Sequence, residues 1–184
     1  MRNFKKTASF FGLIFIIAVL LAFIFRIAIY TLYPLKYEEQ IFKSSYAHNQ
    51  NPYLVMALIK AESNFDASAH SNVAGGLMQL TDDTALWIAD KMGIEFDINI
   101  IENPQMNIEM GCYYLEYLSG LYSDTDVVLA CYNAGMGNVK KWLSDKNFSS
   151  DGKTLENIPF PETKNYVKKV NRYKIVYEKL YGNQ

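Results

Sequence analysis

An uncharged apolar run near the N-terminus constrains this chain more than any other feature. The run covers residues 7–25 and follows the positive charges of Arg2, Lys5 and Lys6. As a helix, these nineteen residues would reach about 28 Å at about 1.5 Å per residue, which is close to the thickness of one bilayer core. The run therefore predicts a membrane-spanning helix.

The residues around this run predict its orientation. Arg26 interrupts it, but residues 27–35 are again mostly apolar, so Arg26 can reach the interface with Tyr30 and Tyr33 as aromatic anchors. Positive charge precedes the run and is not matched just behind it, which predicts a cytoplasmic N-terminus and an extracytoplasmic chain after about Leu35. Secretion after cleavage of a signal peptide is the alternative. It fits less well, because the run exceeds the usual length of about 7–15 residues and no small-x-small cleavage site follows.

Length and charge limit what the rest of the chain can be. The 184 residues, half of them hydrophobic, allow one compact domain of roughly 130 residues. We expect an anchor over residues 1–35, a stalk or linking helix over 36–51 and a domain over 52–184.

Charge is unevenly distributed along the rest of the chain. Residues 37–139 contain three Lys and fourteen acids, whereas residues 140–184 contain ten Lys or Arg and five acids. No basic face large enough for duplex DNA is expected, so nucleic acid is not a predicted partner.

Helix start and stop signals recur along the domain, while the alternation typical of strands is rare. Asn51-Pro52 and Asn103-Pro104 each resemble an N-cap followed by Pro at the first helical position, and Gly93 and Gly120 are stop signals. Residues 63–80 are rich in Ser, Asn, Ala and Gly and are expected to form an irregular loop. The domain is therefore predicted to be all-α. About seven short helices are expected, over residues 36–48, 52–62, 82–92, 104–120, 123–133, 139–143 and 161–180.

Particular residues of these helices are also predicted. Thr81 is expected to cap the helix over residues 82–92, and Ser123 to open the helix over 123–133. The helix over residues 52–62 is expected to turn one apolar stripe toward the core. That stripe consists of Leu54, Val55, Leu58 and Ile59.

Cysteine and histidine are scarce, which limits metal and nucleophile chemistry. Cys112 and Cys131 have no third or fourth partner, so a Cys-based zinc site is not expected. Buried thiols are the main expectation, and a disulfide is the alternative if the chain is exported. His48 and His70 lie in no metal-binding or Ser-His-Asp motif and are expected to be solvated. With no phosphate-binding glycine loop either, neither a metal nor a cofactor is predicted.

Glu62 is the candidate for acid chemistry. It lies where an apolar helix meets a Gly/Ser-rich loop, so its carboxyl group can be half-buried against the helix and still face a cleft. Partial burial raises the pKa of a carboxyl group and keeps its proton available near neutral pH. Such a group can act as a general acid toward a glycosidic oxygen. Judged by position alone, however, a Glu at a helix end is more often a solvated surface group.

Short motifs follow one another in a specific order along residues 52–181. They are AESNF at 61–65, GLMQL at 76–80, TA at 84–85, NP at 103–104, NI at 107–108, Gly111, YL at 114–115, YNAG at 132–135, IP at 158–159, ET at 162–163 and YV at 166–167. Each motif alone is weak, but the ordered series resembles the soluble lytic transglycosylase family. The resemblance implies a goose-type lysozyme fold and a substrate of peptidoglycan glycan strands.

The resemblance also implies roles for residues at the end of the first domain helix and in the loop after it. Glu62 matches the family's single catalytic acid, and Ser63 matches a serine that helps to hold substrate. Gly76, Met78 and Gln79 match the stretch that lines the groove, where Gly allows a close approach, Met packs beside the acid and Gln offers an amide to sugar substituents. A local helix-end cap remains the alternative for Ser63, and a plain core position the alternative for Met78.

Three further residues match the family in the C-terminal half. Tyr132 and Asn133 match its Tyr-Asn-Ala-Gly element beside the acid. Tyr166 matches a tyrosine of the last helix that closes over the scissile linkage. The basic segment that contains Tyr166 either contacts anionic wall polymers or lipid headgroups, or is simply a solvated charged face.

The sequence departs from the family pattern at three places. The interval from Ser71 to Gly76 is one residue shorter than the commonest spacing, which puts the geometry of this loop in question. Cys131 takes a place where Ala is usual. Asp82 and Asp83 replace a frequent Pro-x pair and lie where some goose-type muramidases use an Asp to activate water.

The resemblance implies a lytic transglycosylase that cleaves the bond between N-acetylmuramic acid and N-acetylglucosamine and forms a 1,6-anhydro product. One alternative is a muramidase in which Asp66, Asp82 or Asp83 directs a water molecule, because a hydrolase normally uses two carboxyl groups. The other is a membrane-tethered, non-catalytic glycan-binding scaffold. A monomer is expected in each case.

Overall fold

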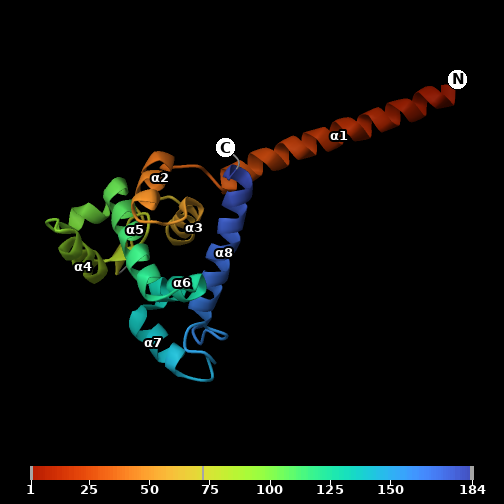
Figure 1. Cartoon of the computed structure of the whole chain (residues 1–184). Coiled ribbons are helices and arrows are strands. Elements are labelled where there is room, and N and C mark those ends of the chain that lie inside the picture. Colours follow the sequence, from red (N-terminus) through yellow and green to blue (C-terminus); the bar gives the residue numbers. More distant parts are fainter. Residues whose placement is uncertain (1, 72, 183–184) are drawn as a thin grey trace. The chain divides into compact units, whose positions relative to one another are not determined.

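The computed structural model describes residues 2–71 and 73–182 (Figure 1). The chain divides into two units, Met1–Lys36 and Tyr37–Gln184. The first unit consists of helix α1, Arg2–Leu32. Its portion Gly12–Leu32 spans 21 residues of high mean hydropathy, and none of them is buried. By length and composition this segment can cross a membrane, although a signal sequence would have the same properties. Arg26 lies over the ring of Tyr30, 5.6 Å from its centroid.

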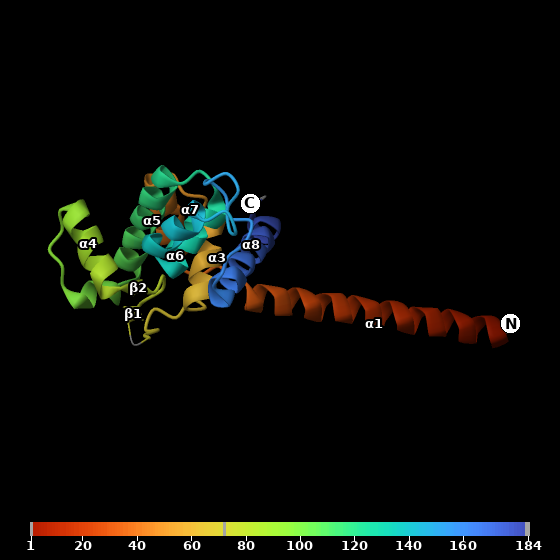
Figure 2. The same cartoon turned by 90° about the horizontal axis from the view of Figure 1, so that it is seen from below.

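The second unit is built from seven helices in the described residues, with one 3₁₀ helix and a two-stranded hairpin. The helices are α2 (Glu38–Ala47), α3 (Pro52–Glu62), α4 (Asp82–Met92), α5 (Pro104–Leu121), α6 (Thr125–Ala134), α7 (Met136–Ser144) and α8 (Pro161–Tyr181). The hairpin strands are β1 (Ala74–Gly75) and β2 (Leu80–Thr81), and the 3₁₀ helix η1 covers Ile98–Ile101. The all-α prediction is confirmed, and both Figure 1 and Figure 2 show α4 and α8 on opposite sides of this unit.

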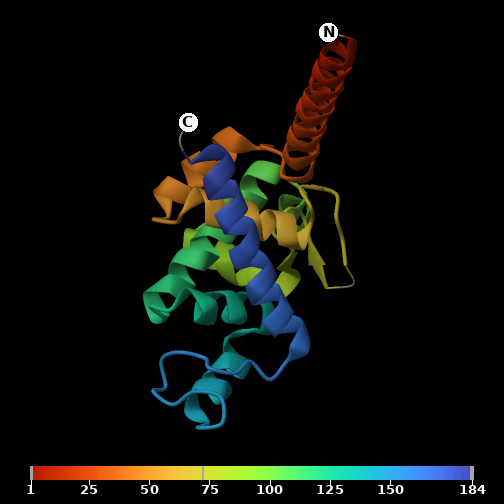
Figure 3. The same cartoon turned by 90° about the vertical axis from the view of Figure 1, so that its right-hand side faces the viewer.

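Helix α3 forms the centre of the core. All residues from Leu54 to Ile59 are buried, including Met56 and Ala57, which lie outside the predicted apolar stripe. The expectation of one buried face was therefore too narrow, because α8 packs along α3 and α2 packs against it as well. A helix that is apolar all round is enclosed by its neighbours. Figure 3 shows α8 crossing the outer side of this core.

Most of the predicted helix ends are confirmed by side-chain caps. Asn51 accepts hydrogen bonds from the backbone of the first turn of α3, Thr81 from that of α4 and Asn103 from that of α5. Gly93 ends α4 with a φ of 67°, which glycine adopts at little cost. The expected cap at Ser123 was wrong by one residue. Asp124 caps α6 instead, because its carboxylate accepts from the backbone N–H of the third helical residue.

Helix α2 occupies most of the segment for which a stalk or linking helix was expected, and it packs against α3 and α5. Ile41, Ser44 and Ser45 are buried there. At the end of α2, His48 lies between two carboxylates of α5, with Nδ1 2.8 Å from Glu116 Oε2 and Nε2 2.9 Å from Glu109 Oε1. The side chain of His48 is only 12% exposed, so the expectation of a solvated histidine was wrong. The two α5 carboxylates that bind it are more than 60 positions away in the sequence, so the residues around His48 do not indicate them.

The short hairpin is the other difference from the prediction. It lies within the expected loop and pairs Ala74 with Thr81 and Gly75 with Leu80 in antiparallel register. Two-residue strands contain too little alternation to be recognised in a sequence. The prediction of buried thiols is confirmed, because Cys112 and Cys131 are both free and buried.

Candidate active site

Glu62 is the last residue of α3, and the core holds the helix that carries it. The backbone turns sharply just beyond it, where Asn64 and Phe65 have φ values of 52° and 64°. A bulky residue rarely adopts this left-handed conformation. Phe65 is only 2% exposed, so burial of its ring stabilises the turn. The Glu62 carboxyl group is therefore attached to the fixed end of a core helix.

A tyrosine from α8 contacts the Glu62 carboxyl group. Tyr166 Oη donates a hydrogen bond to Glu62 Oε1 at 2.6 Å. Burial raises the pKa of Glu62 to about 7, although the Tyr166 hydrogen bond and the charge of Lys169 both act to lower it, while Glu162 adds to the rise. Near neutral pH, Glu62 is thus present in both its protonated and its ionised form. A group that first donates and then accepts a proton needs both forms.

Glu62 lines a pocket of about 350 Å³ between the ends of α3 and α6 and the first turns of α8. The other lining residues are Ala61, Asn133, Glu162, Asn165, Tyr166 and Lys169. A hollow of about 530 Å³ adjoins this pocket, because Asn133 and Glu162 line both. Its remaining lining residues are Ala134, Phe160, Pro161 and Thr163. These two hollows together are called the acid groove below.

Two predicted hydroxyl groups tie the loop between β1 and β2 to the helices around the acid groove. Ser63 Oγ lies 2.8 Å from the carbonyl oxygen of Leu77 and 3.2 Å from that of Ile59, so it can donate to either. Tyr132 Oη donates to the carbonyl oxygen of Met78 at 2.9 Å. Ser63 and Tyr132 therefore connect this loop to the end of α3 and to α6.

A buried amide on α5 determines the shape of the same loop. Asn107 Oδ1 accepts from the backbone N–H of Met78 at 2.7 Å, and Asn107 Nδ2 donates to the carbonyl oxygens of Ile101 at 2.9 Å and Gly75 at 3.2 Å. Gly76 passes so close that a Cβ there would lie 2.2 Å from Asn107 Nδ2. Its φ of 76° also favours glycine. The close approach expected at Gly76 is thus made to protein atoms.

The side chains of Met78 and Gln79 are also engaged by the protein. Met78 is fully buried, and its sulfur packs where Gly111 has no side chain; a Cβ at Gly111 would lie 2.2 Å from Met78 Sδ. Gln79 Nε2 donates to the carbonyl oxygens of Ala69 at 2.8 Å and Gly76 at 2.9 Å. The amide nitrogen of Gln79 is therefore used within the loop, which leaves its amide oxygen for a ligand.

Three of the eight predicted site residues lie together in the acid groove: Glu62, Asn133 and Tyr166. Among the residues that the structure describes, the amide of Asn133 has no hydrogen-bond partner, so it is free to bind a ligand. The other five hold the adjoining loop. They are Ser63, Gly76, Met78, Gln79 and Tyr132.

Further groove residues on α8 were not predicted individually. Glu162, Asn165 and Lys169 line the acid groove together with Tyr166. Lys169 Nζ also donates to the carbonyl oxygen of Ala61 at 3.0 Å, directly before the acid. Positions 162, 165, 166 and 169 follow the spacing of one helix face. Extending the assignment from Tyr166 along this face would have identified them.

None of the three Asp residues considered for a hydrolase lines the acid groove. Asp66 accepts hydrogen bonds from Ser68, while Asp82 and Asp83 are exposed in the first turn of α4. The second carboxylate that lines the groove is instead that of Glu162. Across residues 2–71 and 73–182, no group of three His, Cys, Asp or Glu side chains could hold a metal ion.

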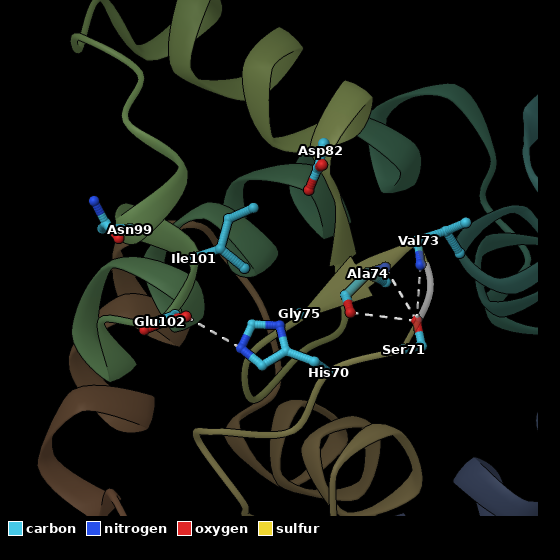
Figure 4. A pocket seen from close by; sticks show the side chains of 9 residues that line it. All are labelled: His70, Ser71, Val73, Ala74, Gly75, Asp82, Asn99, Ile101 and Glu102. Atoms are coloured by element: carbon cyan, nitrogen blue, oxygen red, sulfur yellow. Dashed lines mark hydrogen bonds and ion pairs between the residues drawn. The ribbon is translucent and has the colours of Figure 1, made fainter.

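A separate pocket of about 210 Å³ lies between the loop before β1, the start of α4 and η1 (Figure 4). Its His70 imidazole is half exposed, with Nε2 3.3 Å from Glu102 Oε1. Asp82, Asn99 and Ile101 also line it. No residue of this pocket lines the acid groove.

The all-α unit, with a half-buried glutamate at the end of an enclosed helix, has the lysozyme-like fold of the solved lytic transglycosylases that it matches. The chain belongs to the transglycosylase SLT domain family, whose family model matches residues 39–155. The soluble lytic murein transglycosylase of Escherichia coli K12 is 32% identical over 158 residues, which cover 83% of this chain and 24% of the relative. The membrane-bound lytic murein transglycosylase C of Edwardsiella ictaluri is 29% identical and covers 79% of this chain and 47% of the relative.

Solved structures show the same similarity. The 70 kDa soluble lytic transglycosylase of Escherichia coli matches 84% of this chain with a TM-score of 0.74 and 27% identity, over 26% of its own length. An inactive mutant of the lytic transglycosylase Slt from Pseudomonas aeruginosa matches 80% with a TM-score of 0.72 and 31% identity, over 25% of its length. The chain thus spans about a quarter of its soluble relatives and about half of the membrane-bound one.

Proposed function

We propose that the second unit is a peptidoglycan lytic transglycosylase and that Glu62 is its only catalytic acid and base. The observation that carries the proposal is the Glu62 carboxyl group, which faces the acid groove with a pKa of about 7 and a hydrogen bond from Tyr166. The names of the relatives support the activity and the murein substrate. Further support comes from the inactive Pseudomonas mutant, in which Gln replaces a Glu.

The proposed reaction uses Glu62 twice. Protonated Glu62 gives its proton to the oxygen that links N-acetylmuramic acid to N-acetylglucosamine, and this bond to C1 of the muramic acid breaks. Ionised Glu62 then takes the proton of the muramyl C6 hydroxyl while its oxygen bonds to C1. The product is a 1,6-anhydro end, no water is consumed, and Glu62 is protonated again. Holding the internal hydroxyl next to C1 gives it a large effective concentration over water.

The other residues of the site divide into two roles under this proposal. Asn133 contacts substrate through its free amide, and Tyr166 orients the Glu62 carboxyl group. Ser63, Gly76, Met78, Gln79 and Tyr132 maintain the shape of the loop beside the groove, with the Gln79 oxygen also available to a sugar substituent. Lys169 faces the groove as a positive charge that suits the carboxylate of a muramic acid substituent.

A muramidase is the second candidate, because Glu162 is a second carboxylate in the acid groove. In that case Glu162 would direct a water molecule and the product would keep a reducing end. Mass spectrometry of glycan digested by the full chain distinguishes the two reactions. Products lighter by one water, absent with Glu62→Gln, are expected. Reducing ends that disappear with Glu162→Gln would establish the hydrolase, and wall binding with no released fragment even at high protein concentration would refute both reactions.

We also propose that α1 anchors the protein in the cell membrane, with a cytoplasmic N-terminus and an extracytoplasmic second unit. The length and composition of Gly12–Leu32 support a membrane span, and one relative is named as membrane-bound. The expected result is a chain that stays in the membrane fraction at alkaline pH and is digested by protease added outside spheroplasts. A soluble, shortened chain in the medium would instead establish signal cleavage.

A further inference from the structure

The outward face of α8 carries a row of exposed cations. Lys164, Lys168, Arg172 and Lys179 are all exposed, and their spacing places them on one side of the helix. At about 1.5 Å per residue, the row extends over roughly 22 Å. We call these four residues the basic stripe. Figure 3 shows α8 on the outside of the second unit.

The charges of the basic stripe are not neutralised by the protein. In the parts of the chain that the structure describes, the ion pairs of Lys and Arg are Lys91 with Asp90 and Lys174 with Glu178, and neither involves the stripe. Lys164 donates only to an amide oxygen, and Arg172 lies over the ring of Tyr173. The carboxylate of Glu178, at the border of the stripe, contacts Lys174 and the side-chain amide of Asn51, the residue that caps α3, instead.

The rest of the unit has the opposite charge. Residues 37–139 contain three Lys and fourteen acids, so the positive charge is concentrated in the C-terminal segment. Solvated protein surfaces usually intersperse both signs, and a region of one sign raises the local concentration of an oppositely charged ligand. The stripe is therefore suited to attract anions to a molecule that would otherwise repel them.

The shape of the stripe indicates the kind of anion. The charged side chains follow one another at one or two helical turns, about 6 or 10 Å, which suits a linear polymer with repeated charges better than a single small ion. Insertion of α8 into a lipid interface is disfavoured, because interfacial helices need a broad apolar face. Between Lys164 and Lys179, Ile175 is the only exposed large apolar side chain of α8. Phosphate groups suit both Lys and Arg as partners.

We propose that the basic stripe binds a flexible phosphodiester polymer along the outside of α8. The stripe begins at Lys164, between the groove residues Glu162 and Asn165, so a bound polymer leads to one end of the acid groove. The binding does not depend on whether the groove cleaves glycan. The two proposals can therefore fail independently.

The test measures binding of the full chain, in a non-ionic detergent, to fluorescent poly(glycerol phosphate). At about 0.7 released counterions per contact, four contacts predict an affinity that falls about 50-fold between 50 and 200 mM salt. The triple variant Lys168→Gln, Arg172→Gln and Lys179→Gln keeps one contact, so its affinity should fall only about 3-fold over the same range of salt concentration. Poly-glutamate of equal charge should bind more weakly than the phosphodiester polymer.

A matched control separates the stripe from the overall charge. Lys140→Gln, Lys141→Gln and Lys153→Gln remove the same three charges from other exposed positions, and this variant should keep the steep salt dependence. An equal loss of binding affinity in both triple variants would overturn the proposal. A shallow salt dependence of binding by the unchanged chain would overturn it as well. Nanodiscs with anionic lipid test whether the stripe binds a membrane instead. If they abolish the difference in polymer binding between the unchanged chain and the stripe variant, lipid occupies the stripe and the proposal is wrong.

Discussion

Glu62→Gln is expected to stabilise the protein at neutral pH while it removes the activity. A folded-state pKa of about 7, against 4.5 for an ordinary Glu, means that the unfolded chain releases this proton at lower pH than the folded chain does. The contribution of Glu62 to stability is therefore full below pH 4.5 and is lost as the pH rises to 7. At about 1.36 kcal/mol per pKa unit the loss is about 3 kcal/mol, reduced toward about 2 kcal/mol by solvent at the groove.

Gln at this position does not titrate, so the variant becomes more stable than the unchanged chain as the pH rises. For a chain of this size, about 2–3 kcal/mol corresponds to a difference in Tm of about 5–10 °C. Thermal unfolding of the full chain, followed by far-UV circular dichroism at intervals from pH 4.5 to 8, measures this difference directly. Other titrating groups, such as His48, occur in both proteins and cancel. Glycan cleavage by the variant should fall about 10²- to 10⁴-fold.

The control is Glu95→Gln, which changes an exposed carboxylate outside the groove. Its Tm difference from the unchanged chain should stay constant across the pH range. A constant difference for Glu62→Gln as well would show that its carboxyl group titrates like a solvated one. The burial argument for the proposed acid would then be refuted.

Three other substitutions test separate parts of the structure. Tyr166→Phe removes the hydrogen bond that lowers the pKa of Glu62, so this pKa should rise. The alkaline limb of kcat/KM on soluble glycan chains should therefore move to higher pH, and an unmoved limb would contradict the hydrogen bond. Gly111→Ala should cost about 1–3 kcal/mol in chemical denaturation, because its Cβ meets Met78 Sδ, and much of this cost should vanish when Met78→Ala is added. Burial opposes protonation of His48, but hydrogen bonds to its two α5 glutamates raise its pKa above 6.5. The stability that protonated His48 contributes is therefore present below pH 6.5 and is lost as the pH rises through the raised pKa. His48→Gln should therefore cost about 1–2 kcal/mol at pH 5.5 and less at pH 8 in urea unfolding, whereas an equal cost at both pH values would exclude a charged histidine.

Local signals predicted much of this fold. The two Asn-Pro pairs, Thr81 and Gly93 mark helix ends in the sequence because a cap acts on its own first or last turn. Ser123 and Asp124 are both good capping residues, so the sequence placed the start of α6 only to within one residue. Helix ends were therefore predicted within about a turn.

Contacts between distant segments were harder to predict. Nothing near His48 in the sequence indicates the two carboxylates of α5, more than 60 positions away. The engaged amide of Gln79 and the Lys169 charge in the acid groove likewise depend on how loop and helix pack. Glu62 was identified through its motif, and its partial burial was expected from its place at the end of an apolar helix, whereas the enclosure of α3 and the contacts from α8 were not.

The buried Asn107 makes the loop beside the groove vulnerable to one chemical change. Its nitrogen serves two carbonyl oxygens and its oxygen serves one backbone N–H. An acid at this position, as in Asn107→Asp, would set a second oxygen against both carbonyl oxygens at a fully buried site. The shape of the loop beside the acid groove thus depends on one amide nitrogen, and losing that nitrogen should weaken the activity even though Glu62 is unchanged.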